Sequence, residues 1–548
     1  MKRSRTPLTA ITVTLAALLT LAPSFAQPTE PVQGGHLTVA FLSTIQDSGD
    51  LHRATSSHSA ALVGNVLDTV IRKDPADGSY HAGLAESWVI GDDDRSITLH
   101  LLDGVTFHDG TPFDADAVKY NFDRIATLPE ARGRTAFSWF GAFYERTDVI
   151  DERTVHVVFT APYARMVDVM STNFVGGIHS PTAIETYGEE YGTEIVVGTG
   201  PFRWVEWTGP LGEFTIERNP DYAWGSPIYT NRGAPYLDRV TFRGIVEPGT
   251  RSSALESRSI QIAYLQERDI PRFEATPGFD PLILEKQGTT RYVTFNLESP
   301  LVADIRVRQA ISHAIDREGF LMAPKYANIG QVGLSFLAGP LWGDRSEFEP
   351  HNLMFDLERA AELLDEAGWR DTDGDGIREA HGVAGIPDGT PLRLNQPVNA
   401  NIAEDSEILH GMLAEVGIHT EMQVQDFASK IGNARQGNFD LIFWSTSGSH
   451  YFIIEPILHS RELDGGNNIA NYVNPQVDAW LEEASTSLDP DRQHELFSLV
   501  QKAALDDVVG VPVIDQFFPW VKLSTVHGVT TDSSSVGVYL LDTWMEPN

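Results

Sequence analysis

Hydrophobic residues along the chain fall into short runs of two kinds. Residues 36–41 (HLTVAF) are rich in β-branched and aromatic side chains and predict a strand, whereas residues 61–71 (ALVGNVLDTVI) space their apolar side chains as one face of a helix does. That helical face comprises Ala61, Val63, Val66, Leu67 and Val70. Strand and helix patterns that follow each other in this way predict an α/β fold.

From residue 80 to residue 159, apolar and polar residues alternate, and the turn signals DDD and DG separate the runs. This pattern predicts antiparallel strands around one helix at residues 115–125. Strand patterns return at residues 214–219, 239–245 and 508–514. No tandem repeat or low-complexity linker separates these segments, so we expect interleaved domains.

Three later helices begin with capping residues, at 356–369, 474–485 and 489–505. The first has Asp356 at its N-cap and Gly368 in the position that favours a left-handed backbone. In each of the other two, a capping residue is followed by proline at the first helical position.

Residues 1–26 fit a secretory signal peptide, with a basic start, an apolar stretch at 8–22 and the small-x-small sequence SFA at 24–26. An N-terminal membrane anchor is the alternative, but the stretch is short for a span and is interrupted by threonines. The chain has no cysteine, so the mature protein has no lipidated N-terminal cysteine. We therefore expect a periplasmic protein that begins at Gln27 and is not lipid-anchored.

The 548 residues include 40 Lys and Arg against 76 Asp and Glu, a formal net charge of −36. This charge repels a phosphate backbone, so a nucleic acid partner is not expected. The absence of cysteine excludes disulfides, thiolate zinc sites and cysteine nucleophiles.

No catalytic motif of a known kind is present: there is no Gly-x-Ser-x-Gly, no phosphate-binding glycine loop and no His-Glu-x-x-His. The sequence STSGSH at 445–450 places three serines beside a histidine, which leaves a secreted hydrolase as a minor alternative. A flexible Ser/Gly loop accounts for the same residues.

Asp371, Asp373 and Asp375 alternate in an acidic loop with glycine at its sixth position, a pattern that suits a structural calcium ion. Glu379 is a possible extra ligand, because Gly382 occupies the place of the usual bidentate glutamate. A solvated acidic turn is the alternative. We expect that function requires no cofactor.

Five segments resemble, in order, blocks of the family 5 extracellular solute-binding proteins, the oligopeptide, dipeptide and nickel receptors of ABC importers. They lie at residues 83–125, 197–207, 217–224, 306–318 and 363–379, and the likeness covers essentially all of the mature chain. The resemblance implies a two-lobed periplasmic binding protein-like fold (type II) with an extra domain and a hinge between the lobes.

The resemblance also implies the domain bounds: domain I at 34–73, 195–290 and 512–548, domain II at 74–194, and domain III at 291–511. It implies a monomeric, non-enzymatic receptor that captures a peptide or similar small polar solute between its lobes. The receptor would deliver this solute to the permease subunits of an ABC importer in the inner membrane.

By the same resemblance, ligand-facing residues fall at Thr55, Ser56 and Ser57, at Trp139 and Tyr144, and at Trp444, Ser447 and His450. Peptide receptors of the family hold the α-amine of their ligand with an aspartate three residues after a tryptophan. Here Ser447 stands three residues after Trp444, and a serine cannot pair with a buried ammonium. Glu455 or Asp426 is an alternative partner. An amine-blocked peptide, a sugar, an opine-like solute and a metal chelate therefore remain open as ligands.

Overall fold

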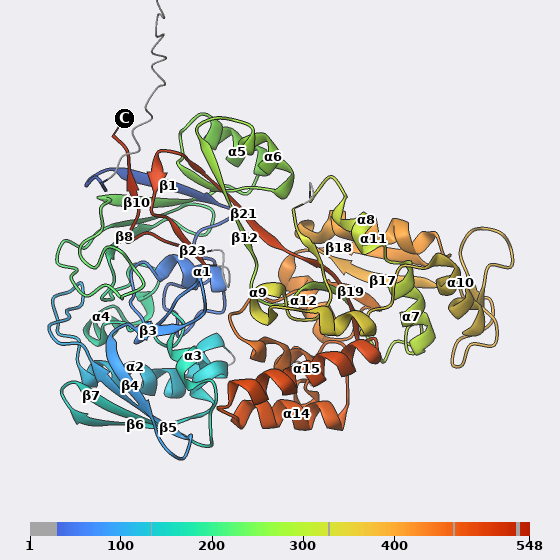
Figure 1. Cartoon of the computed structure of the whole chain (residues 1–548), viewed down its shortest axis with the longest axis horizontal. Helices are drawn as coiled ribbons and strands as arrows, with labels where there is room; N and C mark the ends of the chain where they lie inside the picture. The colour runs from blue at the N-terminus through green and yellow to red at the C-terminus, as the bar shows by residue number, and fades with distance from the viewer. Residues whose placement is uncertain (1–29, 133, 327–328, 464–465, 533–536, 548) are drawn as a thin grey trace, which may run out of the picture.

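The computed structural model describes residues 30–132, 134–326, 329–463, 466–532 and 537–547. The predicted signal peptide lies outside these residues. The chain forms two lobes, one built mainly from its blue to green part and one from its yellow to red part (Figure 1). Among the described helices, none combines the length and the apolar character needed to cross a bilayer.

A seven-stranded sheet forms the upper half of the first lobe (Figure 1). Its order is β12-β21-β11-β1-β10-β9-β8, with β1 parallel to both of its neighbours. The strands are β1 (His36–Phe41), β8 (Phe202–Trp207), β9 (Glu213–Arg218), β10 (Arg239–Gly244), β11 (Ile262–Tyr264), β12 (Phe279–Glu285) and β21 (Phe517–Leu523). The strands predicted at 36–41, 214–219 and 239–245 are thereby confirmed.

The lower half of the first lobe is a four-stranded antiparallel sheet with a helix packed against it. The sheet comprises β4 (Ala85–Ile90), β5 (Ser96–Leu101), β6 (Tyr144–Asp151) and β7 (Thr154–Phe159), and the helix is α2 (Ala115–Thr127). Asp114 caps this helix by accepting a hydrogen bond from the Ala117 N–H at 2.9 Å. The alternating pattern of residues 80–159 therefore predicted this unit correctly.

The helix predicted at residues 61–71 is wrong in its extent. Helix α1 (Ser57–Val63) ends at Gly64, and β2 (Ile71–Lys73) follows after a turn. The Asn65 side chain donates a 2.9 Å hydrogen bond to the Val538 carbonyl and ties the turn to β24 (Gly537–Tyr539). The predicted inward residues are nevertheless all buried: Ala61, Val63, Val66, Leu67 and Val70.

The second lobe contains a four-stranded sheet in the order β14-β20-β13-β19 and a parallel strand pair, with helices around them. The strands are β13 (Arg291–Phe295), β14 (Gln331–Val332), β17 (Arg393–Val398), β18 (His419–Val424), β19 (Leu441–Trp444) and β20 (Gly510–Asp515). The main helices are α7 (Ile305–Ala314), α10 (Leu357–Glu366), α11 (Ala403–Ala414), α12 (Phe427–Arg435), α14 (Pro475–Thr486) and α15 (Pro490–Asp506).

The three predicted N-caps of this lobe are confirmed. Asp356 accepts a hydrogen bond from the Arg359 N–H at 2.9 Å, and Asn474 and Asp489 cap α14 and α15 in the same way. Gly368 has a φ of +92°, the left-handed conformation that its position predicted.

The chain crosses between the lobes along two neighbouring antiparallel segments (Figure 1). Glu285 pairs with Phe517 in the first lobe, Arg291 pairs with Ile514 in the second, and the Lys286 N–H donates to the Gln516 carbonyl at 2.8 Å between them. The predicted domain bound at residue 512 falls inside β20, a strand of the second lobe. The domain bounds remain a prediction.

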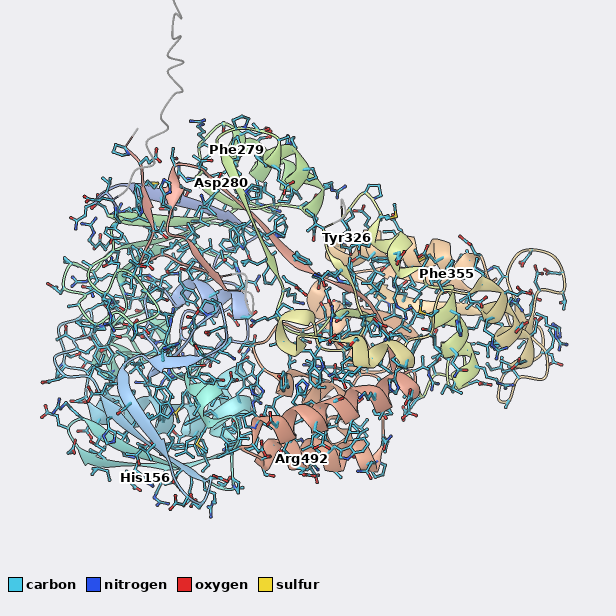
Figure 2. All side chains as sticks on the ribbon, viewed as in Figure 1. His156, Phe279, Asp280, Tyr326, Phe355 and Arg492 are labelled. Carbon is cyan, nitrogen blue, oxygen red and sulfur yellow. The ribbon has the colours of Figure 1, made fainter. Side chains whose placement is uncertain are left out.

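The two lobes lie side by side, and the second extends away from the first toward α10 (Figure 1). Figure 2 labels His156 on the outer sheet of the first lobe and Arg492 on α15 of the second. Close by, the Ala164 N–H donates to the Ser485 carbonyl across the gap at 3.2 Å. The lobes are therefore in direct contact away from the two crossing segments.

Candidate functional site

A cavity of about 960 Å³ lies between the two lobes, and both of them line it. The first lobe contributes residues from the start of α1, the end of β2, the segment around Trp139 and α3 (Met166–Met170). The second lobe contributes residues from α12 and from the segment 443–462. A cavity of this size encloses a small organic molecule.

The structure brings together seven of the eight residues predicted to face a ligand. Those that line the cavity are Thr55, Ser56, Ser57, Trp139, Trp444, Ser447 and His450. Tyr144 does not line it, because its ring stacks on Phe140 at 5.2 Å and its hydroxyl bonds Asp123 and Thr147 within the first lobe. Contact of the other seven with a ligand stays a prediction.

Thr55 and Ser56 are held in place by a single carboxylate. Asp47 Oδ2 accepts the Thr55 N–H at 2.6 Å and the Ser56 N–H at 3.1 Å, and Oδ1 accepts the Ser59 hydroxyl at 2.7 Å. Burial alone would raise the pKa of Asp47, but these hydrogen bonds lower it below its usual value. Asp47 is therefore an ionised group that positions the loop before α1.

The two tryptophans of the cavity each lie beside a cation. The Lys430 ammonium is 5.5 Å from the centroid of the Trp444 ring, and the Arg165 guanidinium is 5.7 Å from that of Trp139. Arg165 also lies 5.4 Å from the ring of Phe452 in the second lobe. Each tryptophan thus presents to the cavity a flat surface flanked by positive charge.

Ser447 is tied to one of the segments that cross between the lobes. It forms a β-bridge with Gly288, and the neighbouring Thr446 and Thr289 exchange hydrogen bonds of 2.7 and 2.8 Å. His450 stacks on Phe452 at 4.8 Å. Removal from water lowers the pKa of His450 to about 4, and Asp168, Lys73 and Arg165 add smaller effects. This histidine is neutral at physiological pH.

The serine-rich stretch makes contacts that do not resemble a nucleophile and its base. The Ser445 hydroxyl donates to Gln516 at 3.1 Å, the Ser449 carbonyl accepts from Lys73, and His450 Nδ1 accepts the Phe452 N–H at 3.4 Å. These contacts fit a loop that lies against the crossing segments.

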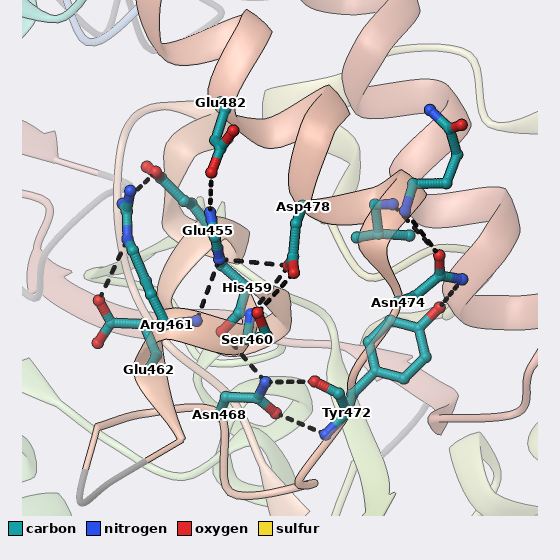
Figure 3. Close-up of polar contacts among 12 residues, drawn as sticks. Glu455, His459, Ser460, Arg461, Glu462, Asn468, Tyr472, Asn474, Asp478 and Glu482 are labelled. Atoms are coloured by element: carbon teal, nitrogen blue, oxygen red, sulfur yellow. Dashed lines mark hydrogen bonds and ion pairs between the residues drawn. The ribbon is translucent and has the colours of Figure 1, made fainter.

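Of the two alternative carboxylates, Glu455 lines the cavity and Asp426 does not. Glu455 is buried and forms an ion pair with Arg461. Figure 3 shows how the turn that carries both is fixed: His459 lies 3.2 Å from Asp478, and Asp478 accepts hydrogen bonds from the Ser460 backbone and hydroxyl at 2.9 and 2.5 Å. Asp426 instead caps α12.

Lys73 connects the two lobes at the floor of the cavity. Its ammonium pairs with Asp168 at 3.0 Å and donates to the Ser449 carbonyl of the second lobe at 2.7 Å. Burial would by itself raise the pKa of Asp168, but Lys73, His450 and Arg165 lower it below its usual value. Asp168 is therefore an anion already neutralised by the protein.

Sequence reasoning missed most of the charged residues of this site, among them Lys73, Arg165, Asp168, Arg291 and Lys430. They come from distant parts of the chain, and no spacing links one to another. The one available signal was the scarcity of cations in so acidic a chain, which does not say where they gather.

The four carboxylates of the acidic loop lie together, away from this cavity. One oxygen from each of Asp371, Asp373, Asp375 and Glu379 can be chosen so that all lie within 4.8 Å of one another. Several backbone N–H groups of the loop also donate to these carboxylates, including Gly374 to Asp371 at 2.7 Å. A structural calcium ion at this loop stays a prediction.

Two lobes that enclose a ligand-sized cavity, with two chain segments crossing between them, define a solute-binding protein of the two-lobed class. The family model described as "Bacterial extracellular solute-binding proteins, family 5 Middle" matches residues 79–461. The chain belongs to this family of solute-binding proteins.

The chain is also similar to a curated relative in sequence and to solved structures in fold. The glutathione-binding protein GsiB of Pectobacterium atrosepticum is 27% identical over 483 residues, which cover 84% of this chain and 83% of that relative. The NikA structure from Brucella suis in complex with Fe(III)-EDTA matches with a TM-score of 0.79 and 22% identity, over 93% of this chain and 100% of NikA. The DppA structure from Helicobacter pylori in complex with the peptide STSA matches with a TM-score of 0.77 and 20% identity, over 94% and 99%.

Proposed function

We propose that this protein is a periplasmic receptor that captures a small polar solute in the cavity between its lobes and delivers it to an ABC importer. The observation that carries the proposal is the cavity of about 960 Å³, which both lobes line. A solute bound there contacts both lobes at once, so it favours the form in which they are closed. The permease subunits in the inner membrane then recognise the closed form.

The proposed solute is peptide-like or of similar size, as is the ligand named for the glutathione-binding relatives. A peptide held by a free α-amine is disfavoured, because Ser447 lies where the family places an aspartate. Both buried carboxylates of the cavity, Asp168 and Glu455, already have cationic partners. Opine-like solutes, oligosaccharides and metal chelates remain alternatives within the same function.

The proposal is tested by native mass spectrometry of the mature protein purified from periplasmic extract without denaturation. We expect a small molecule to travel with the protein and to be lost after unfolding and refolding. Readdition of that molecule should then raise the melting temperature. A protein that carries no solute and is stabilised by none in a broad panel of peptides, sugars and chelates would contradict the proposal.

A further inference from the structure

The charges that line the cavity have the opposite sign to those of the whole protein. The chain has a net charge of −36, yet the described residues of the cavity wall include eight cationic side chains and four carboxylates. The cations are Arg72, Lys73, Arg134, Arg165, Arg291, Lys430, Arg435 and Arg461, and the acids are Asp74, Asp168, Glu455 and Glu462. Arg291 pairs with Asp405 outside the wall, but the other seven cations still outnumber the four acids, so the wall attracts anions.

Three of the four carboxylates of the wall already form ion pairs with wall cations. Asp168 pairs with Lys73 and accepts the Tyr80 hydroxyl at 3.1 Å. Arg461 pairs with Glu455 and lies 3.6 Å from Glu462. Asp74 accepts the N–H of Ala76 within its own turn. The two buried acids, Asp168 and Glu455, are therefore neutralised, and Asp74 is the one acid of the wall that forms no ion pair among the described residues.

Lys430 is a cation without such compensation. Its side chain is 5% exposed, and its ammonium donates one hydrogen bond, to the Phe443 carbonyl at 2.9 Å. Among the described residues, no carboxylate lies within 4.0 Å of it. Burial, and then the charge of Arg291, lower the pKa of Lys430 to about 8. An ammonium has three donors, so two of them are available to an anion in the cavity.

Arg165 is the second uncompensated cation. It lies between the rings of Trp139 and Phe452, and its Nε is buried with no hydrogen-bond acceptor among the described residues. No described carboxylate forms an ion pair with it. The charge of Arg165 contributes to the lowered pKa of Asp168, but that carboxylate pairs with Lys73. A buried donor without an acceptor is costly unless a ligand supplies one.

We propose that the solute is a dianion, which places one anionic group against Lys430 beside Trp444 and the other against Arg165 beside Trp139. This inference rests on the proposed receptor function and specifies the substrate class of its cavity. The solute needs no ammonium group, because the buried carboxylates of the wall, Asp168 and Glu455, are already paired with cations. Carboxylates are anionic groups that both a lysine and an arginine bind well, because their oxygens accept the hydrogen bonds that these side chains donate.

The test is a charge series measured by calorimetry and thermal shift on the full mature protein freed of solute. The probes are glutarate and its diamide, N-acetyl-Ala-Glu and N-acetyl-Ala-Gln-amide, and the neutral sugar maltose. Within each pair the dianionic skeleton should bind at least about 10-fold more tightly than its amide, which corresponds to about 1.4 kcal/mol. Lys430→Met and Arg165→Gln should each remove most of that preference.

Two further readouts separate binding from folding. Because Lys430→Met removes an uncompensated buried charge, the melting temperature of its solute-free form should be unchanged or higher while dianion affinity falls. Arg492→Gln removes the same charge from an exposed site on α15, where Arg492 pairs with Glu483 and Glu495, and should leave affinity unchanged (Figure 2).

The outcomes distinguish this inference from the receptor function. The solute is not a dianion if maltose or the amides bind as tightly as the acids, or if neither cavity variant lowers the affinity for the acids. Either result would leave the proposed receptor function uncontradicted. If no probe binds, the solute found by native mass spectrometry decides: a dianion supports the inference and an uncharged or cationic solute overturns it. If no solute is found either, the receptor function itself fails.

Discussion

Trp444 ends β19 at the cavity wall, where it packs against two hydrophobic clusters of the second lobe and against the Lys430 ammonium. Aromatic side chains in such positions contribute large, rigid contact surfaces at little entropic cost. At the scale of single residues, Trp444 is the side chain whose loss should weaken solute binding most directly.

We expect Trp444→Ala to lower affinity for the native solute by about 10- to 100-fold, which corresponds to about 1.4–2.8 kcal/mol. Trp444→Phe should retain more of the affinity because it keeps an aromatic face. Calorimetry on both variants checks this, with Phe355→Ala, an exposed aromatic outside the cavity wall (Figure 2), as the matched control. Equal affinity of Trp444→Ala and wild type would show that Trp444 does not contribute to solute binding.

The residues of this site were predictable only where a motif marked them. Trp444 and Ser447 stand at a fixed offset that the resemblance made visible. Lys430 and Arg165 are two of 40 basic residues, and nothing in their neighbourhoods distinguishes them from surface cations. Their role depends on which carboxylates lie near them in the folded protein. The sequence pattern does not specify the distance between each cation and those carboxylates.

At the scale of elements, the two crossing segments hold the loop that carries Ser447. Gly288 has a φ of +134°, and a Cβ atom on it would lie 2.2 Å from the Thr446 carbonyl oxygen. A side chain here would therefore force apart the contact between the crossing segment and the cavity wall.

We expect Gly288→Ala to lower the free energy of unfolding by about 1–3 kcal/mol and also to weaken solute binding. Gly411→Ala is the matched control, because Gly411 lies within α11 with no atom inside 4 Å of its would-be Cβ. That change should be neutral or stabilising by up to about 1 kcal/mol. Urea unfolding of both variants measures the difference. Equal stability would show that the contact between Gly288 and Thr446 can shift without a loss of unfolding free energy.

An independent prediction concerns the acidic loop, which lies between α10 and β16 (Glu379–Ala380). If it binds calcium, millimolar Ca²⁺ should stabilise the protein by about 1.4 kcal/mol at ten times the dissociation constant, and Mg²⁺ should act less. Asp373→Asn should abolish the effect, whereas Asp103→Asn, an exposed acid of the first lobe, should not. A melting temperature that is insensitive to Ca²⁺ in the wild type would leave the loop a solvated acidic turn.

The elements themselves were predicted well where local chemistry decides them. The capped helices α10, α14 and α15 begin where Asp356, Asn474 and Asp489 indicate. The helix expected at 61–71 failed because its burial pattern arises from a short helix, a turn and a strand packed in one core. The spacing of hydrophobic residues indicates which side chains are buried. It indicates a helix only where no tertiary contact, such as that of Asn65, ends the helix early.

At the scale of the whole molecule, contacts beyond the crossing segments join the lobes. Lys73 reaches the Ser449 carbonyl, the Ala164 N–H reaches Ser485, and Arg268 pairs with Glu404 at 3.3 Å. These contacts exist only when the lobes are together, so they add to the preference for closure that a solute between the lobes supplies. The resemblance predicted two lobes but not the side chains that touch across them.

The lowered pKa values of the buried histidines allow a prediction of how the free energy of unfolding depends on pH. Burial lowers the pKa of His108, His179 and His450 to about 4 in the folded protein, against about 6.5 in the unfolded chain. Between these values the unfolded chain binds more protons, so stability should fall as the pH drops from about 6.5 to 4. Asp68 acts oppositely, because burial raises its pKa to about 6 and the folded state binds its proton first.

Urea unfolding at several pH values between 7.5 and 4.5 measures this balance, and the net slope should be a loss of stability toward acid. His108→Gln keeps a donor for the Gly200 carbonyl, which accepts from His108 at 2.9 Å, and should flatten the slope by up to about 1.4 kcal/mol per pH unit. Asp68→Asn keeps an acceptor for Trp224 and should steepen it, because it removes the opposing proton uptake. Opposite signs for these two variants are the specific expectation, and slopes that change in the same direction would show that the buried groups do not titrate as their surroundings imply.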